Sequence, residues 1–128
     1  MKLLLDTHTF LWFIEGSDKL SGEARRLIED SSNTRLLSVG SLWEMSIKVS
    51  IGKLDVPLPF TRLAREHVEG NAIEQLSVEA QYLDVQRTLP FHHRDPFDRL
   101  IIAQAQEEEI PVVGKDEAFE DYDIELLW

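Results

Sequence analysis

Short apolar runs alternate along the chain with longer stretches in which apolar residues recur at helical spacing. The short runs are typical of buried strands, whereas the longer stretches place apolar side chains on one face of a helix. Strands and helices in alternation favour a parallel sheet covered on both faces, an α/β fold. The predicted strands lie at residues 1–6, 34–39, 72–76, 110–116 and 123–128.

The helices are bounded by residues that typically start or stop them. Ser21 and Ser77 are predicted N-caps, Gly16 and Gly52 lie near helix ends, and Pro96 occupies the first position of the strongest helix pattern. The predicted helices lie at residues 7–16, 19–32, 40–54, 59–71, 77–89 and 95–109, with a connector at 55–60 interrupted by Pro57 and Pro59.

Composition narrows the class of protein. The 128 residues suit one compact domain, residues 1–128, and a hydrophobic content of 43% allows a real core. The chain has no cysteine, which excludes disulfides and thiolate metal sites. The first six residues are too short for a signal peptide, and no stretch is long enough to span a bilayer. We therefore expect a soluble, cytoplasmic protein.

The formal net charge of −11 argues against a simple phosphate-binding surface. Taken alone, this charge favours basic or cationic partners. An acidic protein can still act on nucleic acid if divalent cations sit in its pocket.

Acidic residues follow two of the predicted strands directly. Asp6 ends the first apolar run, and Asp116 comes just after the run at residues 110–113. Because sites in parallel sheets form beyond the carboxyl ends of the strands, both acids are candidates. The alternative is local: Asp6 caps the helix that follows, and Asp116 caps a small helix at residues 117–121.

Two further acids lie near helix starts. Glu44 could reach the same crevice, although a surface pair with Lys48, worth about 0.2–0.5 kcal/mol, also explains it. Asp95 precedes Pro96 and is best interpreted as an N-cap. Asp98 shares a core-facing stripe with residues 102 and 105, and a buried carboxylate needs a partner, so we expect a functional role for Asp98.

Four converging carboxylates cannot all stay ionised without a counter-charge. One or two hard divalent cations with oxygen ligands, Mg²⁺ or Mn²⁺, would supply it. Such ions activate water and stabilise charge on a phosphate, which is the chemistry of phosphodiester hydrolysis. Asp6 and Asp98 are the expected central ligands, with Glu44 and Asp116 binding a second ion or orienting water.

The blocks LLLDTHTFLW, LSVGSLWEMSIKVSIGKL, LPFHHRDPFDRLIIAQAQEE and VVGKDEAFEDYDIELLW resemble, in this order, those of PIN-domain proteins, specifically VapC-type toxin ribonucleases. The resemblance spans essentially the whole chain. It implies a three-layer α/β/α sandwich with a mainly parallel sheet, Mg²⁺- or Mn²⁺-dependent endoribonuclease activity, a homodimer, and inhibition by a small antitoxin encoded beside it.

The resemblance also assigns positions. It matches the four family acids to Asp6, Glu44, Asp98 and Asp116, and it makes Asp95 the accessory acid. In one respect the chain departs from the family pattern: Thr or Ser often stands two residues before the last acid, where this chain has Gly114.

Other side chains near the acids have two interpretations each. Arg94, Arg99, Lys48 and Lys115 could hold RNA phosphates, or form ordinary salt bridges. His92 and His93 could act as base or ligand, although tandem histidines in a turn are more often incidental. Trp12 and Trp43 could stack on bases, but core packing is the preferred interpretation.

Two other function classes stay open. A receiver-like signalling domain also uses strand-end acids and Mg²⁺, but it should carry paired acids after the first strand and an Asp after the third, which residues 3–8 and 72–76 lack. The other is a catalytically degenerate binding module with an acidic pocket, which Gly114 keeps open.

Overall fold

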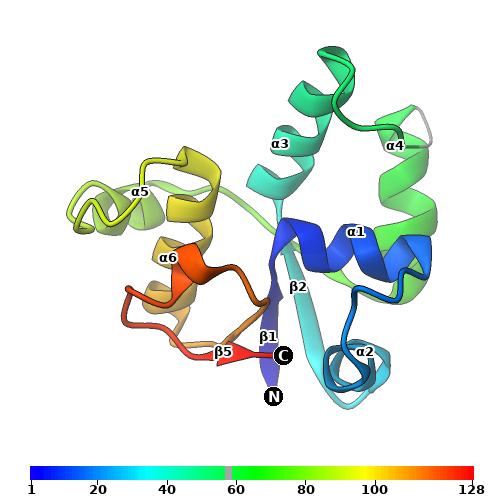
Figure 1. The fold of residues 1–128 in the computed structure, drawn as a ribbon, viewed down its shortest axis with the longest axis horizontal. Coiled ribbons are helices and arrows are strands. Elements are labelled where there is room, and N and C mark those ends of the chain that lie inside the picture. Colours follow the sequence, from blue (N-terminus) through cyan, green and yellow to red (C-terminus); the bar gives the residue numbers. More distant parts are fainter. Residues whose placement is uncertain (57–58) are drawn as a thin grey trace.

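The computed structural model describes residues 1–56 and 59–128, so Pro57, within the predicted connector, lies outside the described residues. In this part of the chain, five strands form one parallel sheet in the order β3-β2-β1-β4-β5 (Figure 1). The strands are β1 (Lys2–Leu5), β2 (Thr34–Ser38), β3 (Glu74–Leu76), β4 (Val112–Val113) and β5 (Leu126–Leu127).

Both faces of the sheet are covered, as the apolar runs predict. Leu3 and Leu5 point into one core and Leu4 into the other, because successive side chains of a strand face opposite sides. Figure 1 shows the two helical layers on either side of the sheet. One layer contains α1 (Thr7–Glu15), α2 (Gly22–Glu29), α3 (Val39–Ser50) and α4 (Phe60–Leu63), and the other contains α5 (Ala80–Gln86) and α6 (Pro96–Glu108).

The strand order places a crevice between β1 and β4. From β1 the chain proceeds outward through β2 to β3, and then returns to the other side of β1 with β4 and β5. Ligands of open α/β sheets bind at such a reversal point, outside the carboxyl ends of the strands. This order differs from the 2-1-3-4-5 order of receiver-like domains, which argues against that alternative.

Local start and stop signals were largely reliable. The Ser21 hydroxyl accepts a hydrogen bond from the backbone N–H of Ala24, and Gly16 ends α1 in the left-handed conformation. Ser77 was the wrong cap: α5 begins at Ala80 after Glu79. The residues before Ala80 make a tertiary contact instead, in which the side-chain amide of Gln104 on α6 donates to the Ser77 carbonyl oxygen.

The segment predicted as one helix at residues 59–71 changes its winding along its length. After α4 come a π-helical segment, η1 (Ala64–Val68), and a 3₁₀ segment, η2 (Glu69–Asn71). The segment ends at Asn71 as predicted, and Ala72 follows with a φ of 56°. Among the described residues, no helix combines the length and the apolar character needed to cross a membrane.

Candidate active site

Asp6 and Asp116 flank the crevice between β1 and β4. The backbone N–H of Asp6 donates to the Val113 carbonyl oxygen at 3.1 Å, so Asp6 emerges where the two strands part. Asp6 occupies the N-cap position of α1, yet its carboxylate makes no capping hydrogen bond. Asp116 does cap, because its Oδ1 accepts from the backbone N–H of Ala118 at 2.9 Å at the start of η3 (Glu117–Phe119). Helix capping therefore explains Asp116 in part but does not explain Asp6.

Gly114 allows β4 to pass close to Asp6. A Cβ atom added at Gly114 would lie 3.0 Å from the Cβ of Asp6 and 3.5 Å from its Oδ2. Gly114, where the resemblance leads us to expect Thr or Ser, thus lies directly against Asp6.

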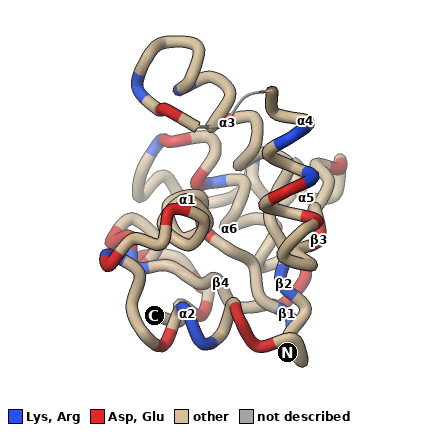
Figure 2. Tube along the Cα trace, turned by 90° about the vertical axis from the view of Figure 1, so that its right-hand side faces the viewer, with Lys and Arg blue, Asp and Glu red and all other residues tan. Residues whose placement is uncertain are grey.

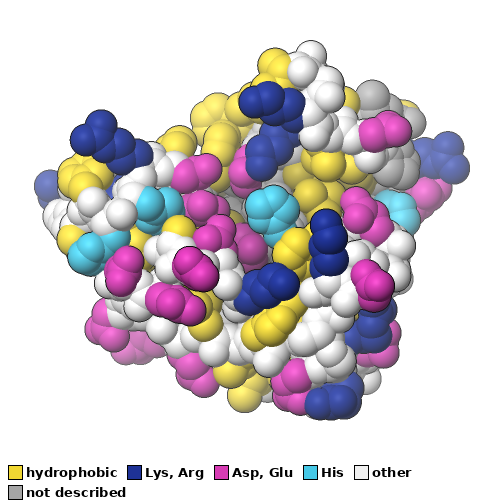
Figure 3. Space-filling model, viewed as in Figure 1, with side chains coloured by type: hydrophobic (Ala, Val, Ile, Leu, Met, Phe, Trp, Pro, Cys, Tyr) yellow, Lys and Arg dark blue, Asp and Glu magenta, His cyan; other side chains and the backbone are white. Residues whose placement is uncertain are grey.

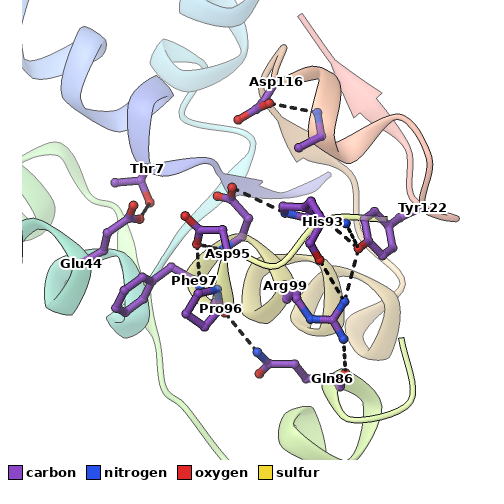
Figure 4. A network of polar contacts seen from close by, with 12 residues as sticks. Thr7, Glu44, Gln86, His93, Asp95, Pro96, Phe97, Arg99, Asp116 and Tyr122 are labelled. Carbon is purple, nitrogen blue, oxygen red and sulfur yellow. Dashed lines mark hydrogen bonds and ion pairs between the residues drawn. The ribbon is translucent and has the colours of Figure 1, made fainter. Parts of the chain in front are cut away.

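Glu44 is buried in the first half of α3 and is held from two sides. The Thr7 hydroxyl donates to Oε1 at 3.1 Å and is hydrogen-bonded to the Ser41 hydroxyl at 2.8 Å (Figure 4). The Nζ of Lys48 lies 3.0 Å from Oε2. The predicted Glu44–Lys48 pair therefore exists, but it is half-buried rather than on the surface. Sequence reasoning missed Thr7, although this residue belongs to the DTH block.

Asp95 and Asp98 divide two tasks at the start of α6. The Oδ1 of Asp95 accepts from the backbone N–H groups of Phe97 and Asp98 at 2.9 and 3.1 Å, which confirms the predicted N-cap. Asp98 points inward and its side chain is 18% exposed, with Oδ2 lying 3.6 Å from Nε2 of His93. Helix initiation is thus the task of Asp95, and Asp98 has no capping role.

Besides burial, the negative charges of other acids contribute to the raised pKa of Asp6 and of Asp98. Burial raises the pKa of Asp6 to about 7; the Thr7 backbone N–H lowers it, while the charges of Asp116 and Glu44 raise it further. The pKa of Asp98 is raised to about 8. The largest cause is burial, and the second is the negative charge of neighbouring carboxylates. Those carboxylates belong, in order of effect, to Asp95, Asp6, Glu44 and Asp116.

The donor set fits a hard divalent cation, because carboxylate oxygens are the ligands that Mg²⁺ and Mn²⁺ prefer. The pKa values of Asp6 and Asp98 are raised by burial and by like charge, and a bound cation would offset both effects. As the side chains of residues 1–56 and 59–128 are placed, no three acids or histidines are close enough to hold one ion together.

The tandem histidines pack on Tyr122. The ring of His92 meets the ring of Tyr122 edge-on at 4.9 Å, and Nδ1 of His93 lies 3.1 Å from the Tyr122 hydroxyl. His93 therefore lies between Tyr122 and Asp98, whereas His92 is exposed.

Arg99 does not face the acids, which corrects the prediction that it holds phosphate. Its buried guanidinium donates to four backbone carbonyl oxygens and to the Tyr122 hydroxyl. Figure 4 shows this side chain pointing toward Tyr122 and Gln86, away from Glu44 and Asp116. Arg99 thus ties the loop before α6 to α5 and to the C-terminal segment. The carbonyls belong to Gln86, Leu89, Pro90 and His93, at 3.1, 3.2, 2.8 and 3.5 Å.

The other basic residues predicted to bind phosphate differ in how accessible their charged groups are. Lys48 is paired with Glu44, Arg94 is exposed, and exposed Lys115 lies over an aromatic ring, that of Trp12. Trp12 is half-buried against the core of the α1 side, but Trp43 is 61% exposed and meets Phe97 edge-on at 5.2 Å. The core-packing interpretation is therefore wrong for Trp43.

Asp6 and Asp116 line a pocket at the crevice together with His8, Trp12 and Lys115. Figure 3 shows acidic side chains grouped near the centre of one face, with histidines at the margin of the group. Basic and acidic residues are interspersed along the rest of the chain (Figure 2).

Comparisons with known proteins agree on this architecture. The sequence model of the PIN domain matches residues 3–125. A structure of VapBC2 from Rickettsia felis, bound to a DNA fragment from its promoter, matches with a TM-score of 0.73 and 18% identity, over 100% of this chain and 99% of that one. FitAB bound to an IR36 DNA fragment matches with a TM-score of 0.64 and 17% identity, over 98% and 93%. FitAcB from Neisseria gonorrhoeae matches with a TM-score of 0.57 and 18% identity, over 98% of this chain and 96% of that one. No curated protein sequence matches the chain.

Proposed function

Because the chain belongs to the PIN domain family, we propose that it is a metal-dependent endoribonuclease, the cytoplasmic toxin of a toxin–antitoxin pair, and that residues 1–128 form its single domain. The observation that carries the proposal is the group of acids at the β1–β4 crevice, two of which have a strongly raised pKa. A bound cation would stabilise these carboxylates in their ionised form, which burial and like charge disfavour. Perturbed pKa values are also typical of functional sites.

Asp6, Glu44, Asp98 and Asp116 would hold one or two Mg²⁺ or Mn²⁺ ions, which supply positive charge at the phosphate and activate the attacking water. Because no three of the described side chains are grouped closely enough to share an ion, their carboxylates would have to turn toward one another for a cation to bind. Asp95 positions Asp98 through the helix cap, and the Thr7 hydroxyl together with Lys48 orients Glu44. Lys115 and Arg94 are the exposed cations that remain for RNA phosphates.

Replacement of the central acids tests the proposal. D6N and D98N keep the shape of each side chain but remove a charged ligand, so we expect metal-dependent cleavage of labelled RNA to fall at least about 100-fold. D84N is the matched control, because Asp84 is exposed on α5 and pairs with Arg87. D6N and D98N proteins that cleave as fast as D84N would refute the site.

The second candidate function is a degenerate binding module, favoured by Gly114 in place of a hydroxyl residue and by the spread of the acids. Titration calorimetry with Mn²⁺ discriminates the two candidates. A module binds its partner protein but no metal, whereas the nuclease binds Mn²⁺ and loses it in D98N.

The net charge and the fold of the chain both support an antitoxin as its partner. The net charge of −11 favours a basic segment, and we propose that an Arg- or Lys-bearing antitoxin tail docks beside the four acids. The structures of VapBC2 and FitAB support this only through their shared fold. A co-structure with the tail bound elsewhere would remove the idea.

A homodimer completes the proposal. Trp43, Ile47 and Ile51 are exposed and spaced four residues apart, so they form one apolar stripe along α3. Exposed apolar patches mark surfaces that other proteins cover, and we place the contact between two copies here.

A further inference from the structure

The crevice between β1 and β4 contains more aromatic surface than a metal site requires. It is a pocket of about 280 Å³. Two carboxylates line one part of it, and an aromatic and cationic set lines the rest: Asp6, Asp116, His8, Trp12 and Lys115. The cleavage chemistry proposed above gives no task to His8 or Trp12.

The rings form one connected group. His8 and Trp12 lie one turn apart on α1, and their rings stack with centroids 5.8 Å apart and planes at 24°. Trp12 in turn meets Trp128, just past β5, edge-on at 5.8 Å. The buried side of Trp12 is explained by its packing on the core around Leu3 and Leu5, but His8 is exposed and core packing does not explain it.

Lys115 is placed over the same rings. Its Nζ lies 5.3 Å from the ring centroid of Trp12 and 5.5 Å from that of Trp128. A cation over an aromatic face is attracted to the ring, so the ammonium group is held at the edge of the pocket, next to Asp116 in the sequence.

A nucleotide combines the features that this pocket offers. Its base is a flat ring that stacks on aromatic side chains, and its phosphate is held by an ammonium group. The volume lies near the lower limit of small-molecule sites, which suits one base better than several. The base belongs against His8 and Trp12, and the phosphate toward Lys115, close to the acids.

We propose that His8 and Trp12 form a stacking platform for one unpaired RNA base beside the cleaved phosphodiester, and that Lys115 holds the adjoining phosphate. This inference rests on the proposed ribonuclease activity and adds a requirement for a base that is free to leave its helix. Stacking does not read base identity, so the platform selects single-stranded positions rather than a sequence.

Substitution of His8 tests the platform. Loss of base stacking costs about 1–3 kcal/mol, so H8A should lower kcat/KM on a single-stranded RNA oligonucleotide about 5- to 150-fold, mostly through KM. H8F keeps a flat ring without ionisable nitrogen and should restore most of the loss. H67A is the matched control, since His67 lies on η1 and does not line the pocket.

Two further measurements separate stacking from other roles. A 2-aminopurine base placed beside the mapped cleavage site should lose fluorescence on binding to wild type and stay bright with H8A. An abasic site at the same position should slow cleavage by wild type as much as the H8A substitution does on intact RNA. It should not slow cleavage by H8A any further. K115M should raise KM. It should also make KM less dependent on salt concentration, by the amount expected for the loss of about one phosphate contact.

The outcomes distinguish this inference from the proposed function. A wild-type protein that cleaves no RNA overturns both. Wild-type cleavage with H8A unaffected, or with H8F as impaired as H8A, overturns the platform and leaves the ribonuclease standing. Weakened binding of a basic antitoxin peptide to H8A, with RNA kinetics unchanged, assigns the pocket to the antitoxin instead and also overturns the platform.

Discussion

At the scale of single residues, the acids of the crevice act against the stability of the fold. A carboxylate whose pKa is raised to about 8 by burial and like charge, as for Asp98, is unfavourable when ionised in the folded protein. Asp95, one turn earlier, is exposed and stabilises α6 through its capping hydrogen bonds. Two aspartates three positions apart therefore have opposite effects, which only their surroundings determine.

The raised pKa of Asp98 gives stability a predictable pH dependence. The pKa of Asp98 is about 8 in the folded protein, against an ordinary value of 3.8, so the folded protein holds this proton more tightly than the unfolded chain. The stability that the protonated Asp98 gives the folded state is therefore fully present below about pH 4 and is lost as the pH rises to about 8. Without metal, D98N should therefore be more stable than wild type at pH 8.5, by on the order of 1–3 kcal/mol, or several degrees in Tm.

Thermal unfolding followed by circular dichroism in EDTA checks this prediction, with D84N as the control that should match wild type. At pH 4.5 the advantage of D98N should largely disappear. Added Mn²⁺ should raise the Tm of wild type and leave that of D98N almost unchanged. A D98N protein less stable than wild type at pH 8.5 would contradict the account.

At the scale of elements, α3 and α6, which carry Glu44 and Asp98, approach each other closely at Gly40. Gly40 lies in the first turn of α3, and a Cβ atom added there would lie 2.5 Å from Cδ2 of Leu100 on α6. The two helices can approach this closely near their N-termini because Gly40 has no side chain and the Leu100 side chain packs directly on its backbone. Glu44 follows one turn later on α3, and Asp98 precedes Leu100 by two residues on α6.

Substitution of Gly40 by alanine should separate these helices. Overpacking costs about 1–3 kcal/mol and outweighs the better helix propensity of alanine, so G40A should lower the free energy of unfolding by about 1–2 kcal/mol. G22A is the matched control: a Cβ at Gly22 would meet only Arg26 at 3.8 Å, and this variant should be neutral or slightly stabilised. Urea denaturation measures both, and equal stability of the two variants would contradict the crossing.

At the scale of the whole molecule, the order of the strands and the net charge determine where partners can bind. Asp6 and Asp116 line the crevice at the reversal point between β1 and β4, whereas the apolar stripe of Trp43, Ile47 and Ile51 runs along α3. With a net charge of −11, two copies repel each other, so a dimer needs an apolar contact.

The stripe predicts how the dimer can be broken. I51E places a charge at the 59% exposed end of the stripe, so wild type should be a dimer and I51E a monomer by sedimentation velocity. L83E, at an exposed leucine on α5 outside the stripe, should stay a dimer. A monomeric wild type, or a dimeric I51E, would remove the stripe from the interface.

The sequence alone determined the features that depend on neighbours along the chain. Apolar runs predicted the strands and a sheet covered on both faces, and Ser21 and Asp95 were recognised as caps because their hydrogen bonds stay within one helical turn. The positions of Asp6 and Asp116 just past β1 and β4 followed from the same patterns. Parallel topology then implied that strand ends share one edge of the sheet.

Only the tertiary structure decided what depends on contacts distant in sequence. Arg99 looked available for phosphate, yet its guanidinium is taken by carbonyl groups of the preceding loop and by Tyr122. Ser77 looked like a cap, but Gln104 holds its carbonyl group. Trp43 looked like core and is exposed. For Arg99 and Ser77 the contacts come from residues outside the local segment, and for Trp43 the exposure depends on how α3 packs in the fold; a pattern of neighbouring residues carries no information about either.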